Sequence, residues 1–430
     1  MLDSKFIREN IDAVKAGAKK KHIEVDIDKL IEVDDKRRAL LQEVESTRAR
    51  QNIASDHVAA AIPQERVRII EEMRVLKENL SVKEKELEEI IKEWQLLMVQ
   101  VPNIPELSVP EGESDADNVE VRISGEIPQF AYTPKSHVEL MQALDMADFE
   151  RGTKVAGFRG YILKGDGALL NFAVWQYVMS YFVHKGGFIP LVVPSLVKRV
   201  AFLGTGYLPQ GEEDLYKTQD GDFLAGTAEV ATMSYYMNEV IPKEQLPLKF
   251  ISFSPCFRRE AGSHGKDTKG LMRVHEFFKF EQVVLCEASH QTSVMHHEEL
   301  TKNAEEMLLA LQLPYRVVVN CGGDLGLGQV KKYDIEAWVP SESRYRETHS
   351  SSYFHDFQSR RLNIRYRDTD GSMQYAHSLN NTALATPRIL ISIIENNQNE
   401  DGSINIPLVL QPFMNGREKI DLKVSLQEKN

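Results

Sequence analysis

One stretch of the sequence, from Ser252 to Leu285, gathers residue types that suit the binding of a nucleotide. It reads SFSPCFRREAGSHGKDTKGLMRVHEFFKFEQVVL and predicts a strand, a polar loop with glycines and lysines, and a returning strand. Arg258 and Glu260 stand two residues apart where the first strand ends, so both side chains are expected on one face of the sheet. By the same alternation, the second strand presents His275, Phe277, Lys279 and Glu281 together.

The chemistry of these residues points to phosphates and an aromatic base. A guanidinium group and a flexible cationic loop suit the oxygens of a polyphosphate, and an aromatic ring between charged residues suits base stacking. Taken alone, the stretch also fits a surface hairpin with ordinary ion pairs. The sequence has no G-x-x-x-x-G-K-[ST] loop, no dinucleotide-binding glycine spacing and no G-x-S-x-G elbow. The run His296-His297-Glu298-Glu299 lacks HExxH spacing, which favours a solvated helix face over a metal site.

The run from Cys256 to Glu281 closely resembles motif 2 of the class II aminoacyl-tRNA synthetases, in the form found in seryl-tRNA synthetases. That form is C-F-R-x-E-A-G-x-x-G-[RK]-D-T-[RK]-G-x-x-R-x-H-Q-F-x-K-x-E, and this chain departs from it at Glu276, where glutamine is usual. LAGTAEV resembles the serine-site segment of the same family. KGGFIPLVVPSLV resembles motif 1, with its proline at Pro194.

The resemblance extends over essentially the whole chain. GDLGLGQVKKYDIEAWVP and YRETHSSSYFHDFQSRRL match the segment before motif 3, and NNTALATPRILISIIENNQNEDGSINIPLVLQPFM resembles motif 3, with Arg388 as its arginine. Many members read N-G-S-G-L-A-x-G-R where this chain has NNTALATPR. Thr382 replaces a serine but keeps the hydroxyl group, and Pro387 replaces a glycine, so the departures concern affinity rather than activity.

The resemblance implies a two-step reaction. The carboxylate of L-serine attacks the α-phosphate of ATP, which gives seryl-adenylate and pyrophosphate. The 3′-hydroxyl of the terminal adenosine of tRNA(Ser) then takes the seryl group. Whether tRNA(Sec) is also charged stays open. Neither step needs a protein nucleophile, because the catalytic requirement is positioning and charge neutralisation at phosphorus.

The same resemblance implies a role for each site residue. Arg258 and Arg388 are the expected catalytic residues, since the planar fork of Arg258 can bridge the α-phosphate and the serine carboxylate. Phe277 and Arg388 would sandwich the adenine, and Glu260 would orient its amino group. The serine set is Thr227, Ala228, Glu229, Arg258, Glu281 and Thr382. The ATP set is Arg258, Arg259, Glu260, Val274, Phe277, Glu347, Thr348, His349, Ser350 and Arg388.

A magnesium ion is the expected cofactor. The resemblance implies that Glu347 and Ser350 hold Mg²⁺ against the phosphates, and hard oxygen ligands are those that this ion prefers. No zinc is expected, because no matching set of cysteine and histidine residues occurs.

The elements that must position these residues begin with an N-terminal helical region. Between Met1 and about Gln100, two series at three- and four-residue steps indicate a coiled-coil seam, and Pro63 separates them. An antiparallel helical hairpin of about 35 residues per helix would reach roughly 50 Å, so it should project as an arm. Its basic residues are interleaved with acids and include Lys19, Lys20, Lys21, Arg37, Arg38, Arg48 and Arg50. The series are Leu30, Val33, Arg37, Leu40, Val44, Thr47, Gln51 and Ile69, Met73, Leu76, Leu80, Lys83, Leu87, Ile90, Trp94, Leu97.

The domain organisation predicted from these patterns has three parts. Residues 1–100 form the tRNA-binding domain with its coiled-coil arm, residues 101–118 form a linker rich in proline and acids, and residues 119–430 form the catalytic domain. FISFSPCFR, FEQVVL and YRVVVN predict strands, and Leu169–Val183 and Ala385–Asn396 predict helices. Irregular alternation favours an α+β fold on an antiparallel sheet flanked by helices. The resemblance implies a homodimer built on the first of these helices, and an arm that holds the long variable arm of the tRNA.

Composition sets the broad class. The 430 residues carry a net charge of −12, which neither supports nor excludes an RNA partner, because binding is local. No apolar run is long enough for a membrane span, and the start MLDSKFIREN lacks the apolar region of a signal peptide. With three scattered cysteines, a cytoplasmic enzyme with no membrane contact is expected.

Two alternatives remain at this stage. A ligase that charges a carrier protein with a small amino acid would share the catalytic domain but lack the arm, and the predicted arm disfavours it. A non-catalytic RNA-binding or scaffold relative would be expected to lose Arg258, Glu347 or Arg388, and all three are present.

Overall fold

The computed structural model describes residues 1–60, 62–263 and 265–422. Contacts between Cα atoms divide the described chain into two compact units. The smaller unit contains Met1–Lys19 and Ile23–Pro102, and the larger contains Lys20–His22 with the chain from Asn103 on.

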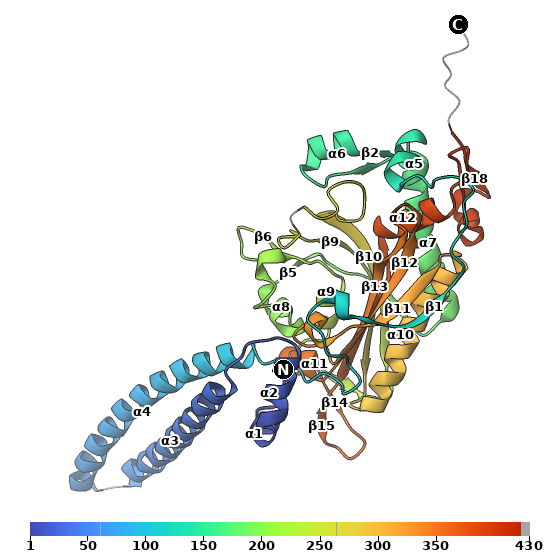
Figure 1. Ribbon diagram of the computed structural model, residues 1–430. Helices are drawn as coiled ribbons and strands as arrows, with labels where there is room; N and C mark the ends of the chain where they lie inside the picture. Colours follow the sequence, from blue (N-terminus) through green and yellow to red (C-terminus); the bar gives the residue numbers. More distant parts are fainter. Residues whose placement is uncertain (61, 264, 423–430) are drawn as a thin grey trace. The chain divides into compact units, whose positions relative to one another are not determined.

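The smaller unit is helical, with α1 (Ser4–Glu9) and α2 (Ile11–Lys20) before the long helices α3 (Ile27–Ala60) and α4 (Pro63–Met98). Helices α3 and α4 run side by side as a hairpin (Figure 1). A proline at the first position of a helix loses no hydrogen bond, so α4 can begin at Pro63.

The hairpin seam follows the predicted heptad positions. Val44, Leu80 and Leu87 are buried there, and Leu40 and Ile91 pack against them. The guanidinium carbon of Arg37 lies 4.6 Å from the ring centre of Trp94, and Arg48 and Glu84 form an ion pair of 2.7 Å between the helices. Farther from the base, Gln51, Ile69 and Met73 are only half-buried, so the seam loosens along the hairpin as the sequence predicts.

The larger unit is built on a sheet that, within the described residues, has eight strands in the order β1-β11-β12-β13-β16-β10-β9-β4. Neighbouring strands are antiparallel except β4 and β9, which are parallel. The α+β prediction with a mainly antiparallel sheet is confirmed. The strands are β1 (Val119–Ser124), β4 (Ile189–Val192), β9 (Leu248–Phe257), β10 (Glu276–Cys286), β11 (Tyr315–Val319), β12 (Lys331–Val339), β13 (Arg344–His355) and β16 (His377–Thr386).

The two faces of the sheet differ in what covers them (Figure 1). On one face, α5 (His137–Ala143), α7 (Asp166–Lys185), α10 (His290–Ala310) and α12 (Arg388–Asn396) supply the main apolar core. On the other, residues of α9 (Glu229–Ser234) and α11 (Phe357–Leu362) cover one end of β9 and β10, and α8 (Arg199–Thr205) packs against both helices. The rest of that second face carries the site described below.

Shorter elements connect these layers. They are α6 (Phe149–Ala156), β2 (Ala147–Asp148), β3 (Ile162–Leu163), β5 (Leu196–Val197), β6 (Tyr216–Lys217), β7 (Phe223–Leu224), β8 (Val240–Pro242), β14 (Arg365–Arg367), β15 (Met373–Tyr375), β17 (Ile404–Asn405) and β18 (Lys419–Ile420). No helix in the described ranges is long and apolar enough to cross a membrane.

Two local predictions are wrong. The helix predicted from Ala385 begins instead at Arg388, because Ala385 and Thr386 pair with β10 as the end of β16 and the sheet ladder prevails over the helical pattern. His296 and His297 are buried rather than solvated, because α10 lies on the sheet. The ring of His297 stacks on that of Tyr333 with centres 4.8 Å apart.

The proline-rich segment after the helical region is tied to the larger unit. The side-chain amide of Asn103 donates to the carbonyl oxygens of Gly328 and Phe354, at 3.0 and 2.8 Å. The backbone N–H of Glu106 donates to the carbonyl of Val330 at 3.0 Å. Extended backbone without a ladder of its own is thus fixed by individual hydrogen bonds to the catalytic unit.

Candidate active site

A cavity of about 250 Å³ lies on the open face of the sheet and is lined from β10, β13 and β16. Strand β10 contributes Phe277, Lys279 and Glu281, which alternate along it as predicted, while Phe280 faces the core on the opposite side. His275 does not join them. It precedes β10, and its Nδ1 lies 3.0 Å from the carbonyl oxygen of Arg258.

Arg258 and Glu260 both line the cavity, although only the first follows from strand geometry. The guanidinium carbon of Arg258 lies 5.3 Å from the ring centre of Phe277, and Nη2 donates to the carbonyl of Gly226 at 3.3 Å. Glu260 lies beyond the end of β9 with a φ of 56°, so a left-handed turn brings it to the wall. Its Oε2 accepts from Nη1 of Arg273 at 2.5 Å.

Three guanidinium groups influence one another at this end of the cavity. Arg388, the first residue of α12, donates through Nε to the carbonyl of Met272 and through Nη1 to the carbonyl of Glu347, both at 3.1 Å. Burial lowers the pKa of Arg388, and the nearby charges of Arg258 and Arg273 lower it further. Because like charges in one cavity are stabilised by an anion, this end suits the oxygens of a polyphosphate.

A pair of buried carboxylates marks the other end. Glu229 and Glu281 both line the cavity. Tyr207 donates to Oε2 of Glu229 at 2.8 Å, and Gln358 donates to Oε1 at 2.6 Å. Burial and the charge of Glu281 raise the pKa of Glu229 to about 7, and burial raises the pKa of Glu281. Lys279 already pairs with one of these two desolvated carboxylates, and a further cation would stabilise the other, so this end suits an ammonium group.

The sequence did not assign a role to three residues at this end: Tyr207, Lys279 and Gln358. Nζ of Lys279 lies 2.6 Å from Oε2 of Glu281. The alternation of Lys279 with Phe277 and Glu281 was a usable signal, whereas Tyr207 and Gln358 come from loop and helix positions without a pattern. Arg273, at the phosphate end, stood inside the recognised motif without a role.

The segment Thr227–Glu229 is only partly on the wall. Glu229 lines the cavity and Thr382 does so from β16, where its Cα lies opposite that of Glu281. Thr227 and Ala228 do not line it. The hydroxyl of Thr227 accepts from the N–H of Glu229 at 3.2 Å, and the carbonyl of Ala228 accepts from the hydroxyl of Thr232 at 2.8 Å. Both residues therefore set the start of α9 and the orientation of Glu229.

Two further residues of the expected ATP set point elsewhere. Arg259 is exposed, and its Nη1 donates to the carbonyl of Glu213 at 3.0 Å. A bulge in β13 between Glu347 and His349 turns Glu347, Thr348 and Ser350 to the cavity. His349 consequently does not line the cavity, and its Nε2 lies 3.1 Å from the carbonyl oxygen of Ala383.

Val274, another residue of the expected ATP set, lines the cavity wall as expected.

A loop formed by Gly326–Gln329 completes the wall and is held by a buried lysine. Nζ of Lys21 donates to the carbonyls of Gly326, Leu327 and Gln329 at 3.0, 3.0 and 2.5 Å. Its place among the N-terminal basic residues suggested that Lys21 could contact RNA. Because its ammonium group is buried against these three carbonyls, Lys21 is not a free basic group for RNA.

The fold and the site together define a class II aminoacyl-tRNA synthetase: an antiparallel sheet with helices on one face, and arginines, carboxylates and an aromatic ring on the other. The family model for the tRNA synthetase class II core domain (G, H, P, S and T) matches residues 216–397, and the one for the seryl-tRNA synthetase N-terminal domain matches residues 1–105. The serine–tRNA ligase of Deinococcus radiodurans is 47% identical over 419 residues, which cover 97% of this chain and 98% of that protein. The chain belongs to the seryl-tRNA synthetase family, the ligases that join serine to tRNA with ATP.

Solved structures agree. The seryl-tRNA synthetase of Pyrococcus horikoshii, complexed with ATP, is 36% identical with a TM-score of 0.88, covering 98% of this chain and 99% of that one. The cytoplasmic serine–tRNA ligase of Naegleria fowleri, in complex with AMP, is 30% identical with a TM-score of 0.86, covering 99% of each chain.

Proposed function

We propose that ATP binds at the arginine end of the cavity and L-serine at the carboxylate end, so that the serine carboxylate meets the α-phosphate beside Arg258. The supporting observation is that Arg258 lies in the same cavity wall as Arg388 and the Glu229–Glu281 pair. A guanidinium fork between two anions neutralises both and lowers the barrier to attack at phosphorus. The ATP and AMP complexes of the two related structures support the nucleotide assignment.

The test of this assignment is amino-acid-dependent exchange of ATP with pyrophosphate. Serine is expected to support exchange, while alanine and glycine leave the buried polar groups of the pocket unpaired and should be rejected by about 10⁴-fold. Threonine should be refused for lack of room for its methyl group. Equal exchange with alanine or threonine would contradict the serine assignment.

A pH dependence follows from Glu229. Its pKa is raised from 4.5 to about 7, so in the free protein it stabilises the fold below about pH 4.5 and this stability is lost as the pH rises through 7. The serine ammonium group favours the ionised carboxylate. The KM for serine is therefore expected to fall by about tenfold between pH 6 and pH 8.

Glu229→Gln should raise the KM for serine by about 30-fold or more and remove this pH dependence, because the buried charge is gone. Exchange assays at fixed saturating ATP measure both effects. Glu244→Gln changes an exposed carboxylate and serves as the control. A wild-type KM that does not change with pH would count against the role of Glu229.

Magnesium fits the nucleotide end. Glu347 and Ser350 line the cavity beside Arg388, and the Glu347 carboxylate is 51% exposed, with its Oε2 3.8 Å from Nη1 of Arg388. Within the described residues, no three histidine, cysteine, aspartate or glutamate side chains form a metal cluster, and Mg²⁺ is commonly held by one or two protein oxygens together with substrate phosphates. Bound there, the ion would neutralise phosphate charge.

A homodimer and a cytoplasmic setting complete the proposal. Leu169, Phe172 and Val183 of α7 and Val192 of the edge strand β4 are exposed apolar side chains, and Phe158 lines one surface hollow together with Phe172. Exposed apolar groups on a helix and a sheet edge are what a second copy would cover. Cys256, Cys286 and Cys321 are free thiols, which suits a reducing compartment.

A further inference from the structure

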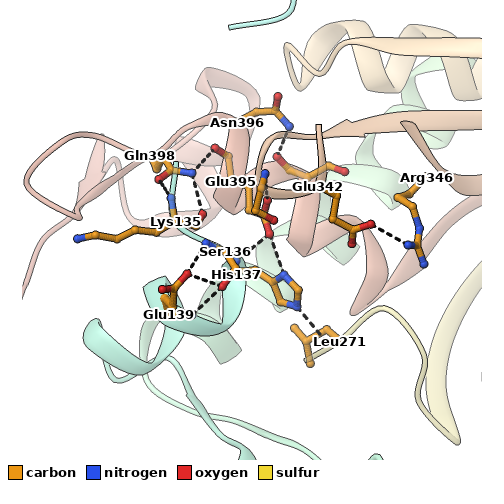
Figure 2. A network of polar contacts seen from close by, with 12 residues as sticks. Lys135, Ser136, His137, Glu139, Leu271, Glu342, Arg346, Glu395, Asn396 and Gln398 are labelled. Carbon is orange, nitrogen blue, oxygen red and sulfur yellow. Dashed lines mark hydrogen bonds and ion pairs between the residues drawn. The ribbon is translucent and has the colours of Figure 1, made fainter. Parts of the chain in front are cut away.

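Figure 2 shows a buried chain of hydrogen bonds that ends at Leu271, a residue of the cavity wall. It joins Glu395 on α12, His137 at the start of α5, and the backbone of Leu271 in the loop that follows β9. Glu395 is fully buried, and His137 is 7% exposed. The ATP and serine sites described above use neither side chain.

The hydrogen bonds fix the tautomer of His137. Nδ1 lies 2.8 Å from Oε1 of Glu395, which also accepts from the backbone N–H of His137 at 2.8 Å. Oε2 accepts from the N–H of Ser341 at 3.0 Å. Burial opposes the charge of Glu395, but these hydrogen bonds hold its pKa below its ordinary value, so the group is a carboxylate. A carboxylate only accepts, so Nδ1 carries the proton and Nε2 is left as an acceptor.

Nε2 of His137 accepts a hydrogen bond from the backbone N–H of Leu271, at 3.2 Å. The residue before it, Gly270, has a φ of 80°, and a Cβ there would lie 2.3 Å from Nε2. Leu271, Met272 and Val274 line the cavity, and Arg273 binds Glu260. His137 therefore fixes the point where the loop re-enters the nucleotide wall.

Helix α12 fixes the segment Leu271–Val274 through contacts at two of its neighbouring residues, Leu271 and Met272. Arg388 and Glu395 are seven residues apart, which places them on the same side of the helix. Arg388 donates to the carbonyl of Met272, and Glu395 orients the imidazole that accepts from Leu271. The same helix thus sets both a residue of the nucleotide site and the loop that faces it.

We propose that His137, oriented by Glu395, is a positioning residue for ATP: it holds Leu271–Val274 in the conformation that receives the nucleotide. This inference rests on the proposed function of the cavity. Without the Nε2 acceptor, the Leu271 N–H is unpaired in a buried place and the segment gains alternatives that ATP must suppress on binding. Serine, held by Glu229 and Glu281, does not depend on this segment.

Two substitutions separate positioning from simple structural support. His137→Asn can donate to Glu395 but is too short to reach Leu271, whereas His137→Gln places its amide near the position of Nε2 and can present oxygen to Leu271. In pyrophosphate exchange, the KM for ATP is expected to rise by about tenfold in the asparagine variant and by less than about threefold in the glutamine variant. The KM for serine should change by less than about twofold in both.

His297→Asn is the matched control, since His297 is equally buried on the sheet but lies outside the cavity wall. Gly270→Ala removes the contact from the loop side and should raise the KM for ATP as well, which keeps the test available if an α5 variant is unstable. Amide exchange of a peptide spanning 268–275 should be faster than wild type in the asparagine variant without ATP, and should slow when ATP is added.

Equal KM values for ATP in the asparagine and glutamine variants, or an equal rise in the KM for serine, would overturn the positioning role. Failure of wild-type protein to exchange pyrophosphate with serine would instead refute the proposed function, so the two failures are distinguishable.

Discussion

Replacing Arg258 with alanine is expected to reduce serine-dependent pyrophosphate exchange by about 10³-fold or more, with the fold retained. The side chain lies on the ring of Phe277 in the cavity wall and makes one weak hydrogen bond, to Gly226 at 3.3 Å. Little of the fold therefore depends on this side chain, whereas under the proposed function it neutralises both anions of the adenylation step. Arg258→Lys should remain impaired by about tenfold or more, because an ammonium group cannot present two parallel donors.

Arg259→Ala provides the matched control for Arg258. It removes the same side chain one residue later, where the guanidinium is exposed and reaches the carbonyl of Glu213 rather than the cavity. Exchange in this variant should stay within about twofold of wild type. Activity of Arg258→Ala within tenfold of wild type would show that Arg258 has no catalytic role. A large loss in Arg259→Ala would mean that a change in the loop conformation, and not the loss of the Arg258 guanidinium group, reduces exchange.

The sequence predicted those parts of the site that depend on regular strand geometry. Phe277, Lys279 and Glu281 lie on one wall because a strand alternates, and a motif of more than twenty residues fixed their identity. It did not predict where alternation is interrupted. Glu260 reaches the wall through a left-handed turn, and the bulge in β13 separates Glu347 and Ser350 from His349.

Residues that support others were hardest to find. Tyr207 and Gln358 reach Glu229 from segments 22 and 129 residues away, and His137 reaches Leu271 across 134 residues. The spacing of residues along the sequence does not predict such contacts, because only the tertiary packing brings the partners together. The directions of the Arg259 and His349 side chains, which do not line the cavity, could not be predicted for a different reason: a motif names neighbours along the chain without saying which way each one points.

The hairpin was predictable because its seam is a local repeat. Val44 and Leu80 lie in one buried cluster where α3 and α4 pack together, while beyond them the seam residues are half-buried and apolar groups such as Ile53, Ile70 and Val75 are exposed. Exposed residues in this outer portion of the hairpin add little to its stability, which suggests that the outer portion binds a partner.

Shortening the hairpin should therefore separate the two steps of the reaction. Replacing residues 45–79 with a short glycine-serine linker keeps the Val44–Leu80 contact and the base of the hairpin. Serine-dependent pyrophosphate exchange should remain within about twofold of wild type, because the cavity belongs entirely to the larger unit. Charging of tRNA(Ser) should fall by about 10²-fold or more, equivalent to the loss of about 3 kcal/mol of tRNA binding.

Glu84→Gln is the point control for this deletion. It breaks the 2.7 Å pair with Arg48 on the exposed hairpin surface without shortening the hairpin or removing a basic group, so the change in folding stability should be under about 1 kcal/mol. If tRNA binds along the hairpin through its phosphates, added NaCl should weaken charging by the full-length protein more steeply than charging by the shortened one. Unchanged charging after the deletion would contradict the expected role of the hairpin in tRNA binding, and a parallel loss of exchange would show that the shortened protein had failed to fold.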